Sequence, residues 1–140
     1  MPESTGPRLQ ELLGIQRGEG GRMELRFADP VTNHVGYMHA SAQFALAEIS
    51  SGDYLGQQFP QWRDRVVAVV RRAEIKYSRP VAADLTAYVH IDEDEQQRFL
   101  HQLENRGRAL ISVNVELKER QGELATQAVY QWFVQSRLVV

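Results

Sequence analysis

The hydrophobic pattern of the first forty residues predicts two short elements separated by loops. Three leucines at helical spacing in residues 9–13 precede Gly14, which predicts a short helix that ends at the glycine. Residues 17–22 contain three glycines and predict a loop. Residues 22–28 alternate between polar and apolar side chains, as a half-buried strand does. Residues 29–38 are polar and contain a proline and a glycine, which predicts an irregular loop.

Residues 39–56 form the longest apolar segment. In a helix built from this segment, apolar side chains would lie on nearly every side. They include several alanines, Phe44, Leu46 and Ile49, and polar side chains are few. A helix that is apolar nearly all round is a buried helix, here of about five turns. Because most of its side chains are small, the helix can lie close against a sheet.

Strands dominate the rest of the chain. Segments in which apolar and polar residues alternate, or in which valine is frequent, predict four strands. Between the second and third strands, a segment that begins with acidic residues and continues with apolar residues at helical spacing predicts one more helix. The strands are residues 65–77, 83–91, 108–118 and 123–139, and the helix is residues 92–105. One buried helix followed by a largely antiparallel sheet predicts an α+β fold in which the sheet wraps the helix.

Composition and charge narrow the class of protein. The 140 residues are 43% hydrophobic and 24% charged, which predicts a single globular domain over residues 1–140, with 1–7 as a flexible leader. The absence of cysteine excludes disulfides and thiolate metal sites. A net charge of −2 disfavours nucleic-acid binding. No apolar run is long enough for a membrane span and no signal peptide is visible, so we expect a cytoplasmic protein.

The residue that stands out is Glu48, a carboxylate near the middle of the apolar helix. Burying an unpaired carboxylate is costly, so such a residue is normally paired, protonated or functional. The alternative, weighted equally on position alone, is that Glu48 lies on an exposed stripe with Ser41 and Ser51. A buried, functional Glu48 would be able to activate water or to attack a substrate directly.

The segment before this helix offers complementary chemistry. The free backbone N–H groups of a helix start, here at His39, can stabilise a developing oxyanion. Asn33, just upstream, can orient a carbonyl or a water molecule. Together with Glu48, these groups form a set suited to hydrolysis of an activated carbonyl.

These residues resemble a known family. The segment Asn-His-Val-Gly-Tyr-Met-His-Ala-Ser at 33–41, with Glu48 nine positions after His39, resembles the hotdog-fold acyl-CoA thioesterases, in particular their phenylacetyl-CoA thioesterase-like branch. Tyr-Ser-Arg-Pro at 77–80 is similar to a turn that ends a strand in that family, and the element order agrees over roughly residues 9–139. The resemblance implies a long central helix wrapped by a curved antiparallel sheet, in a homodimer or homotetramer with sites at the interface.

The resemblance also implies residue roles. Glu48 would be the catalytic base or nucleophile, Asn33 would position water or the carbonyl, and the backbone at His39 and Ala40 would form the oxyanion hole. His-Ala-Ser replaces the usual His-Gly-Gly; alanine keeps its backbone donor, but the added Cβ atoms crowd a substrate. The residues expected to bind substrate are Gly36, Ser41, Ser51 and Arg79, the last because a guanidinium suits the phosphates of coenzyme A.

Other classes of protein fit less well. The four histidines lack metal-ligand spacing, so no metal site is expected. No Gly-x-Ser-x-Gly elbow and no phosphate-binding glycine loop occur. The sequence therefore predicts an acyl-CoA thioesterase that needs no cofactor beyond the coenzyme A of its substrate. The alternative is a catalytically inactive hotdog protein that binds acyl-CoA or a lipid-like ligand.

Overall fold

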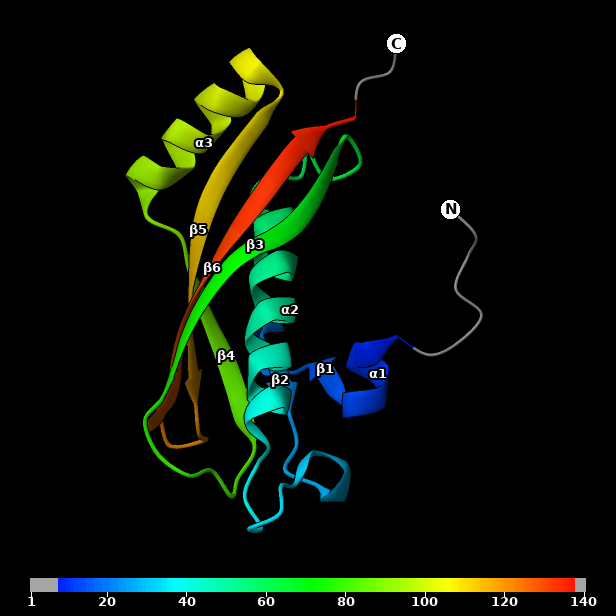
Figure 1. The fold of residues 1–140 in the computed structure, drawn as a ribbon, viewed down its shortest axis with the longest axis vertical. Helices are drawn as coiled ribbons and strands as arrows, with labels where there is room; N and C mark the ends of the chain where they lie inside the picture. The colour runs from blue at the N-terminus through cyan, green and yellow to red at the C-terminus, as the bar shows by residue number, and fades with distance from the viewer. Residues whose placement is uncertain (1–7, 138–140) are drawn as a thin grey trace.

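A computed structural model of the chain describes residues 8–137 (Figure 1). A long helix, α2 (Ala40–Gln58), lies against one face of a curved, antiparallel, six-stranded sheet with the order β1-β2-β4-β5-β6-β3. The strands are β1 (Ile15–Arg17), β2 (Met23–Leu25), β3 (Val66–Tyr77), β4 (Leu85–His90), β5 (Arg108–Lys118) and β6 (Leu124–Ser136). The predicted α+β arrangement is therefore confirmed. The predicted leader, residues 1–7, lies outside the described residues.

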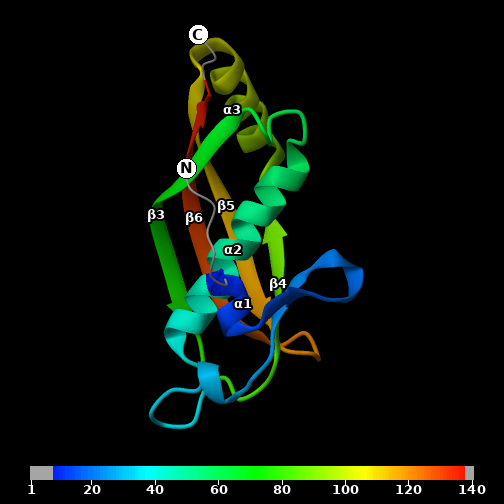
Figure 2. The same ribbon diagram turned by 90° about the vertical axis from the view of Figure 1, so that its right-hand side faces the viewer.

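The centre of the sheet is the hairpin of β5 and β6. Its register runs from Arg108 opposite Gln135 to Lys118 opposite Leu124. Every second residue of β5 from Ala109 to Leu117 is buried, as expected for a strand with one face against the helix. Strand β3 pairs with β6 on one side only and is an edge of the sheet. Figure 2 shows the sheet curving round one side of α2.

Small side chains allow α2 to approach the sheet closely. Leu46 and Ala47 have no exposed surface, and Ala42 is almost completely buried. The helix begins after His39, whose Nδ1 accepts a hydrogen bond of 3.1 Å from the backbone N–H of Ser41. This contact satisfies one of the N–H groups that a helix start leaves without a partner.

A second hydrophobic cluster lies at the C-terminal end of α2. Helix α3 (Glu93–Arg106) covers it with Phe99 and Leu103, which pack against β5 and the end of α2. The rings of Phe59 and Phe99 lie 5.1 Å apart. Acidic residues occupy the first turn of α3, where they complement the helix dipole. The helix ends at Gly107, which has a φ of 71°.

The structure corrects several predicted boundaries. The loop expected from residue 17 begins instead with the end of β1 and continues as the 3₁₀ turn η1 (Glu19–Gly21). The strand expected at 22–28 shortens to β2, and a second 3₁₀ turn, η2 (Asp29–Val31), lies in the expected irregular loop. The short N-terminal helix is present as α1 (Leu9–Leu13), ended by Gly14. No helix in the described part of the chain is long and apolar enough to span a membrane.

Candidate functional site

Glu48 lies on the half-buried side of α2 and lines a groove of about 510 Å³. Among residues 8–137, its carboxylate makes no hydrogen bond and no ion pair. The groove is shared with residues of the N-terminal segment and of β6, including Arg17, Met23 and Trp132. Ser51 is completely buried, so the alternative of an exposed stripe running through Ser41, Glu48 and Ser51 is wrong.

Ser51 holds one wall of this groove in place. The indole Nε1 of Trp132 donates a hydrogen bond of 2.9 Å to the Ser51 hydroxyl. That hydroxyl in turn donates to the backbone carbonyl of Glu48 at 2.7 Å. Ser51, expected to bind substrate, therefore contacts a wall residue of the groove and its own helix. Because Trp132 stands on β6 and Ser51 on α2, the pair also ties the helix to the sheet.

Tyr130 lies beneath the same part of α2. Its side chain is completely buried, and its hydroxyl donates to the backbone carbonyl of Phe44 at 2.9 Å. Burial raises the pKa of Tyr130 far above its usual value of 10.0, and the negative charge of Glu48 raises it further. The phenol therefore stays neutral at physiological pH and adds no charge near Glu48.

The start of α2 presents a free donor. The N–H of Ser41 is bonded to the His39 ring, whereas that of Ala40 has no acceptor among the described residues. Ala40 and Ser41 are exposed. The hydroxyl of Tyr77, at the end of β3, donates to the Ala40 carbonyl at 3.1 Å and fixes this end of the helix. A donor of this kind suits the oxyanion-hole role expected of the backbone at Ala40.

Asn33 organises the loop that leads to the helix. Its Oδ1 accepts from the backbone N–H groups of Val35 at 3.0 Å and Tyr37 at 2.9 Å. Gly36 completes the turn with a φ of 88°, a conformation that favours glycine. The Oδ1 atom of Asn33 is thus occupied within the loop, and its amide N–H groups are the part of the side chain that remains for a ligand.

Arg79 lies in a carboxylate cluster. Its guanidinium pairs with Glu119 and with Glu123, the latter at 2.8 Å, and its buried Nε has no hydrogen-bond partner within the part of the chain that the structure describes. These carboxylates belong to the turn between β5 and β6, so the ion pairs tie that turn to the segment after β3. The expected contact with a coenzyme A phosphate remains a prediction, and it would compete with these two carboxylates.

Within a single chain, the predicted residues other than Arg79 form two groups. Glu48 and Ser51 lie at the middle of α2, whereas the residues at and before the helix start do not line the Glu48 groove. Eight residues of helix separate Ala40 from Glu48, which is about 12 Å along the axis. The two groups therefore lie about two turns apart on the same helix.

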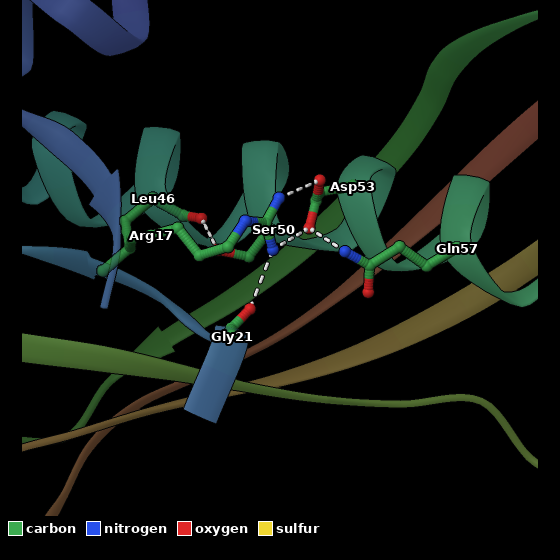
Figure 3. Close-up of polar contacts among 6 residues, drawn as sticks. All are labelled: Arg17, Gly21, Leu46, Ser50, Asp53 and Gln57. Carbon is green, nitrogen blue, oxygen red and sulfur yellow. Dashed lines mark hydrogen bonds and ion pairs between the residues drawn. The ribbon is translucent and has the colours of Figure 1, made fainter. Parts of the chain in front are cut away.

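Sequence reasoning missed the residues that surround Glu48. Arg17 of β1 forms a two-pronged ion pair with Asp53 of α2, at 2.8 and 3.1 Å, and also donates to the Gly21 carbonyl at 2.8 Å (Figure 3). Gln57 donates to the same Asp53 carboxylate at 3.2 Å. The one local signal for this cluster was a charged residue, Asp53, within the apolar helix.

A larger cavity lies beyond this ion pair. Its volume is about 650 Å³, and its wall is mainly hydrophobic. The side chains that form it come from the C-terminal half of α2, the beginning of β3, the end of β6 and α3. No cluster of three or more metal-ligating side chains occurs among residues 8–137.

Comparisons with known proteins place this geometry in context. Residues 4–134 match the family described as a domain of unknown function, DUF4442. No curated protein matches the chain. Solved structures that share the fold include proteins from Pseudomonas aeruginosa, Bacillus halodurans and Haemophilus influenzae. A Pseudomonas aeruginosa protein of unknown function, described as a probable thioesterase, is 22% identical, with 83% of this chain and 76% of that one covered and a TM-score of 0.67.

The second similar structure is a Bacillus halodurans protein solved with CoA, which is 22% identical over 90% of this chain and 74% of that one, with a TM-score of 0.69. A Haemophilus influenzae thioesterase is 16% identical over 91% of this chain and 82% of that one, with a TM-score of 0.72. Identities this low show the fold alone. The hotdog fold expected from the sequence is confirmed.

Proposed function

Because the chain belongs to the DUF4442 family and has a hotdog fold, we propose that it hydrolyses an acyl-CoA thioester to a free acid and CoA, with Glu48 as the catalytic carboxylate. The observation that carries this proposal is the half-buried carboxylate of Glu48 at the wall of a groove, without a hydrogen-bond or ion-pair partner among residues 8–137. Two of the similar structures are described as thioesterases and a third was solved with CoA, which supports the same class of substrate.

The proposed reaction uses Glu48 as a general base. Glu48 takes a proton from a water molecule, and the water oxygen adds to the thioester carbonyl carbon. The free N–H of Ala40 stabilises the negative charge that develops on the carbonyl oxygen. The C–S bond then breaks, the acid is released, and the proton held by Glu48 passes to the CoA sulfur. In the second route Glu48 attacks the carbonyl itself and the C–S bond breaks; water then adds to the Glu48 carbonyl carbon of the resulting anhydride, which releases the acid, and the proton from water passes to the CoA sulfur.

The separation between Ala40 and Glu48 supports a site completed by a second protomer. If two copies of α2 lie side by side in opposite directions, Ala40 of one copy approaches Glu48 of the other. The unpaired edge of β3 is the surface suited to this association, because it is 12 residues long and exposes Val67 and Val69. We therefore propose a homodimer, or a homotetramer built from it.

The second candidate is a hotdog protein that binds acyl-CoA or a lipid-like ligand without cleaving it. The observation that favours it is the pair of exposed Cβ atoms at Ala40 and Ser41, where a substrate carbonyl would approach the helix start. Both candidates predict acyl-CoA binding, and they differ in whether thiol is released.

The deciding experiment measures free-thiol release from acyl-CoAs of short, medium, long and aromatic acyl groups. We expect Glu48→Gln to lower turnover about 100- to 10,000-fold, because a general base contributes that much. Glu104→Gln is the matched control, since Glu104 is an exposed carboxylate on α3. Equal turnover in wild type and Glu48→Gln would refute the role of Glu48. Binding without turnover in wild type would favour the second candidate.

The choice between the two routes needs a single turnover in isotope-labelled water. Direct attack places the label in the Glu48 carboxylate, whereas base catalysis places it only in the released acid. Sedimentation at several protein concentrations tests the dimer, and a stable monomer would refute it.

A further inference from the structure

The Glu48 groove and the larger hydrophobic cavity meet at four residues. Arg17, Gly52, Asp53 and Trp132 line both spaces. These four residues therefore form the boundary between the two spaces, and its side-chain groups are the Trp132 indole and the Arg17–Asp53 ion pair. We call these two features the constriction.

Both sides of the constriction are held in place. The indole packs against the bare backbone of Gly52, where a Cβ atom would lie only 2.9 Å from its Cη2 atom. Its Nε1 is bonded to the buried Ser51 hydroxyl at 2.9 Å. Two hydrogen bonds hold Arg17 against Asp53 (Figure 3).

The cavity beyond the constriction suits an apolar chain. Its wall includes Leu55, Phe59, Trp62, Phe99, Leu103 and Val134. Its volume of about 650 Å³ is typical of a site for a small molecule. Most of these side chains belong to the second hydrophobic cluster, so a chain that enters would leave water for a hydrocarbon surface.

We propose that this cavity binds the distal part of a straight acyl chain, and that Trp132 and the Arg17–Asp53 pair determine which acyl groups reach it. This inference rests on the proposed function and adds its substrate class, a linear acyl chain of medium or greater length. Trp132 and Asp53 are then specificity-determining residues, and Gly52 is the position that lets the indole lie against α2.

Two glycines of α2 provide the variants that test the cavity. Gly56 lines it, and a Cβ atom there would meet only Arg63, at an ordinary 3.5 Å. Gly56→Leu should therefore fold and fill part of the cavity. Gly56→Ala adds one methyl group and is its matched control.

Two aromatic residues of β6 test the constriction. Trp132→Ala removes the indole from the groove side of the sheet. Phe133→Ala removes a neighbouring ring from the opposite face, because successive side chains of a strand alternate. Trp132→Phe keeps an aromatic ring and should change selectivity in the same direction as Trp132→Ala, but less. It therefore replaces Trp132→Ala if that variant does not fold.

The experiment is calorimetric titration of butanoyl-, octanoyl-, dodecanoyl- and phenylacetyl-CoA into these variants, each combined with Glu48→Gln to prevent turnover. Affinity should rise about fourfold for each methylene that enters the cavity. Gly56→Leu should abolish this rise without changing butanoyl-CoA binding, and Gly56→Ala should keep it. Trp132→Ala should lower the preference for dodecanoyl- over phenylacetyl-CoA at least tenfold, whereas Phe133→Ala should not.

An affinity that does not depend on chain length, or a rise that survives in Gly56→Leu, would overturn the acyl-chain site. A dodecanoyl preference unchanged in the Trp132 variants would overturn the role of the constriction. These outcomes are independent of the thiol-release assay. Binding that rises with chain length in a protein without turnover would refute the proposed function and support this inference. Turnover combined with an affinity that does not depend on chain length would support the proposed function and refute this inference.

Discussion

Gly52→Ala tests directly how closely Trp132 packs against α2. In a solvent-exposed helix, replacing glycine by alanine stabilises by about 1 kcal/mol. At Gly52, however, the new Cβ would lie 2.9 Å from Cη2 and 3.0 Å from Cζ2 of the Trp132 indole. One of the two must move, and the indole is held by its hydrogen bond to Ser51.

The structure gives the size of the effect. Overpacking a close contact costs about 1–3 kcal/mol. Losing the indole hydrogen bond costs about 1 kcal/mol more. Alanine's higher helix propensity offsets about 1 kcal/mol of these costs. Gly52→Ala should therefore lower the free energy of unfolding by about 1–3 kcal/mol. Gly56→Ala, the same change one turn further along α2, has space for its methyl group and should raise the free energy of unfolding by up to about 1 kcal/mol.

The assay is urea denaturation of both variants and wild type at one protein concentration, since association would otherwise alter apparent stability. The expected difference between the two variants is about 1–4 kcal/mol, with opposite signs relative to wild type. If Gly52→Ala raised the free energy of unfolding as much as Gly56→Ala, Trp132 would not pack closely against Gly52. The constriction would then lose its physical basis.

Three further predictions concern the same region. Ser51→Ala should lower the free energy of unfolding by about 1–3 kcal/mol by removing the acceptor of the Trp132 indole, which urea denaturation and near-ultraviolet circular dichroism would detect. Because the pKa of Tyr130 is raised on folding, its stabilising contribution is complete below pH 10.0 and declines above it; Tyr130→Phe should flatten this alkaline loss in a pH series of denaturations. Arg17→Gln should cost less than about 1 kcal/mol, because its pair with Asp53 is partly exposed, and added salt should shrink the difference from wild type.

How well each element could be predicted depended on its length. Strand β5 matches its predicted bounds because eleven alternating residues leave one register that buries the apolar face. Helix α2 was predicted within two residues at each end, because its apolar composition is unusual over many positions. Strand β1 was missed because three residues are too few for a period, and its structure depends on pairing with β2.

The candidate site divides in the same way. Glu48 could be singled out because a carboxylate within an apolar helix conflicts with its surroundings, and that conflict is visible in the local sequence. The start of α2 could be located from the loop residues before it. The role of Asn33 within the protein could not be predicted, because the backbone N–H groups that it binds are positioned by the fold of its own loop. The role of Arg79 could not be predicted either, because its carboxylate partner Glu119 lies in a turn forty residues away.

The sequence by itself determined the α+β class, the long buried helix, the wrapped antiparallel sheet and the position of one unusual carboxylate. The helix and its carboxylate follow from side-chain patterns within one element, and the class and the wrapped sheet follow from the order of elements along the chain. Only the tertiary structure decided what surrounds that carboxylate. Trp132 meets Ser51 across 81 residues of sequence, and Arg17 meets Asp53 across 36. Such contacts depend on the register of β6 and on where β1 lies beside α2, because a hydrophobic pattern specifies which face is buried but not which side chains meet there.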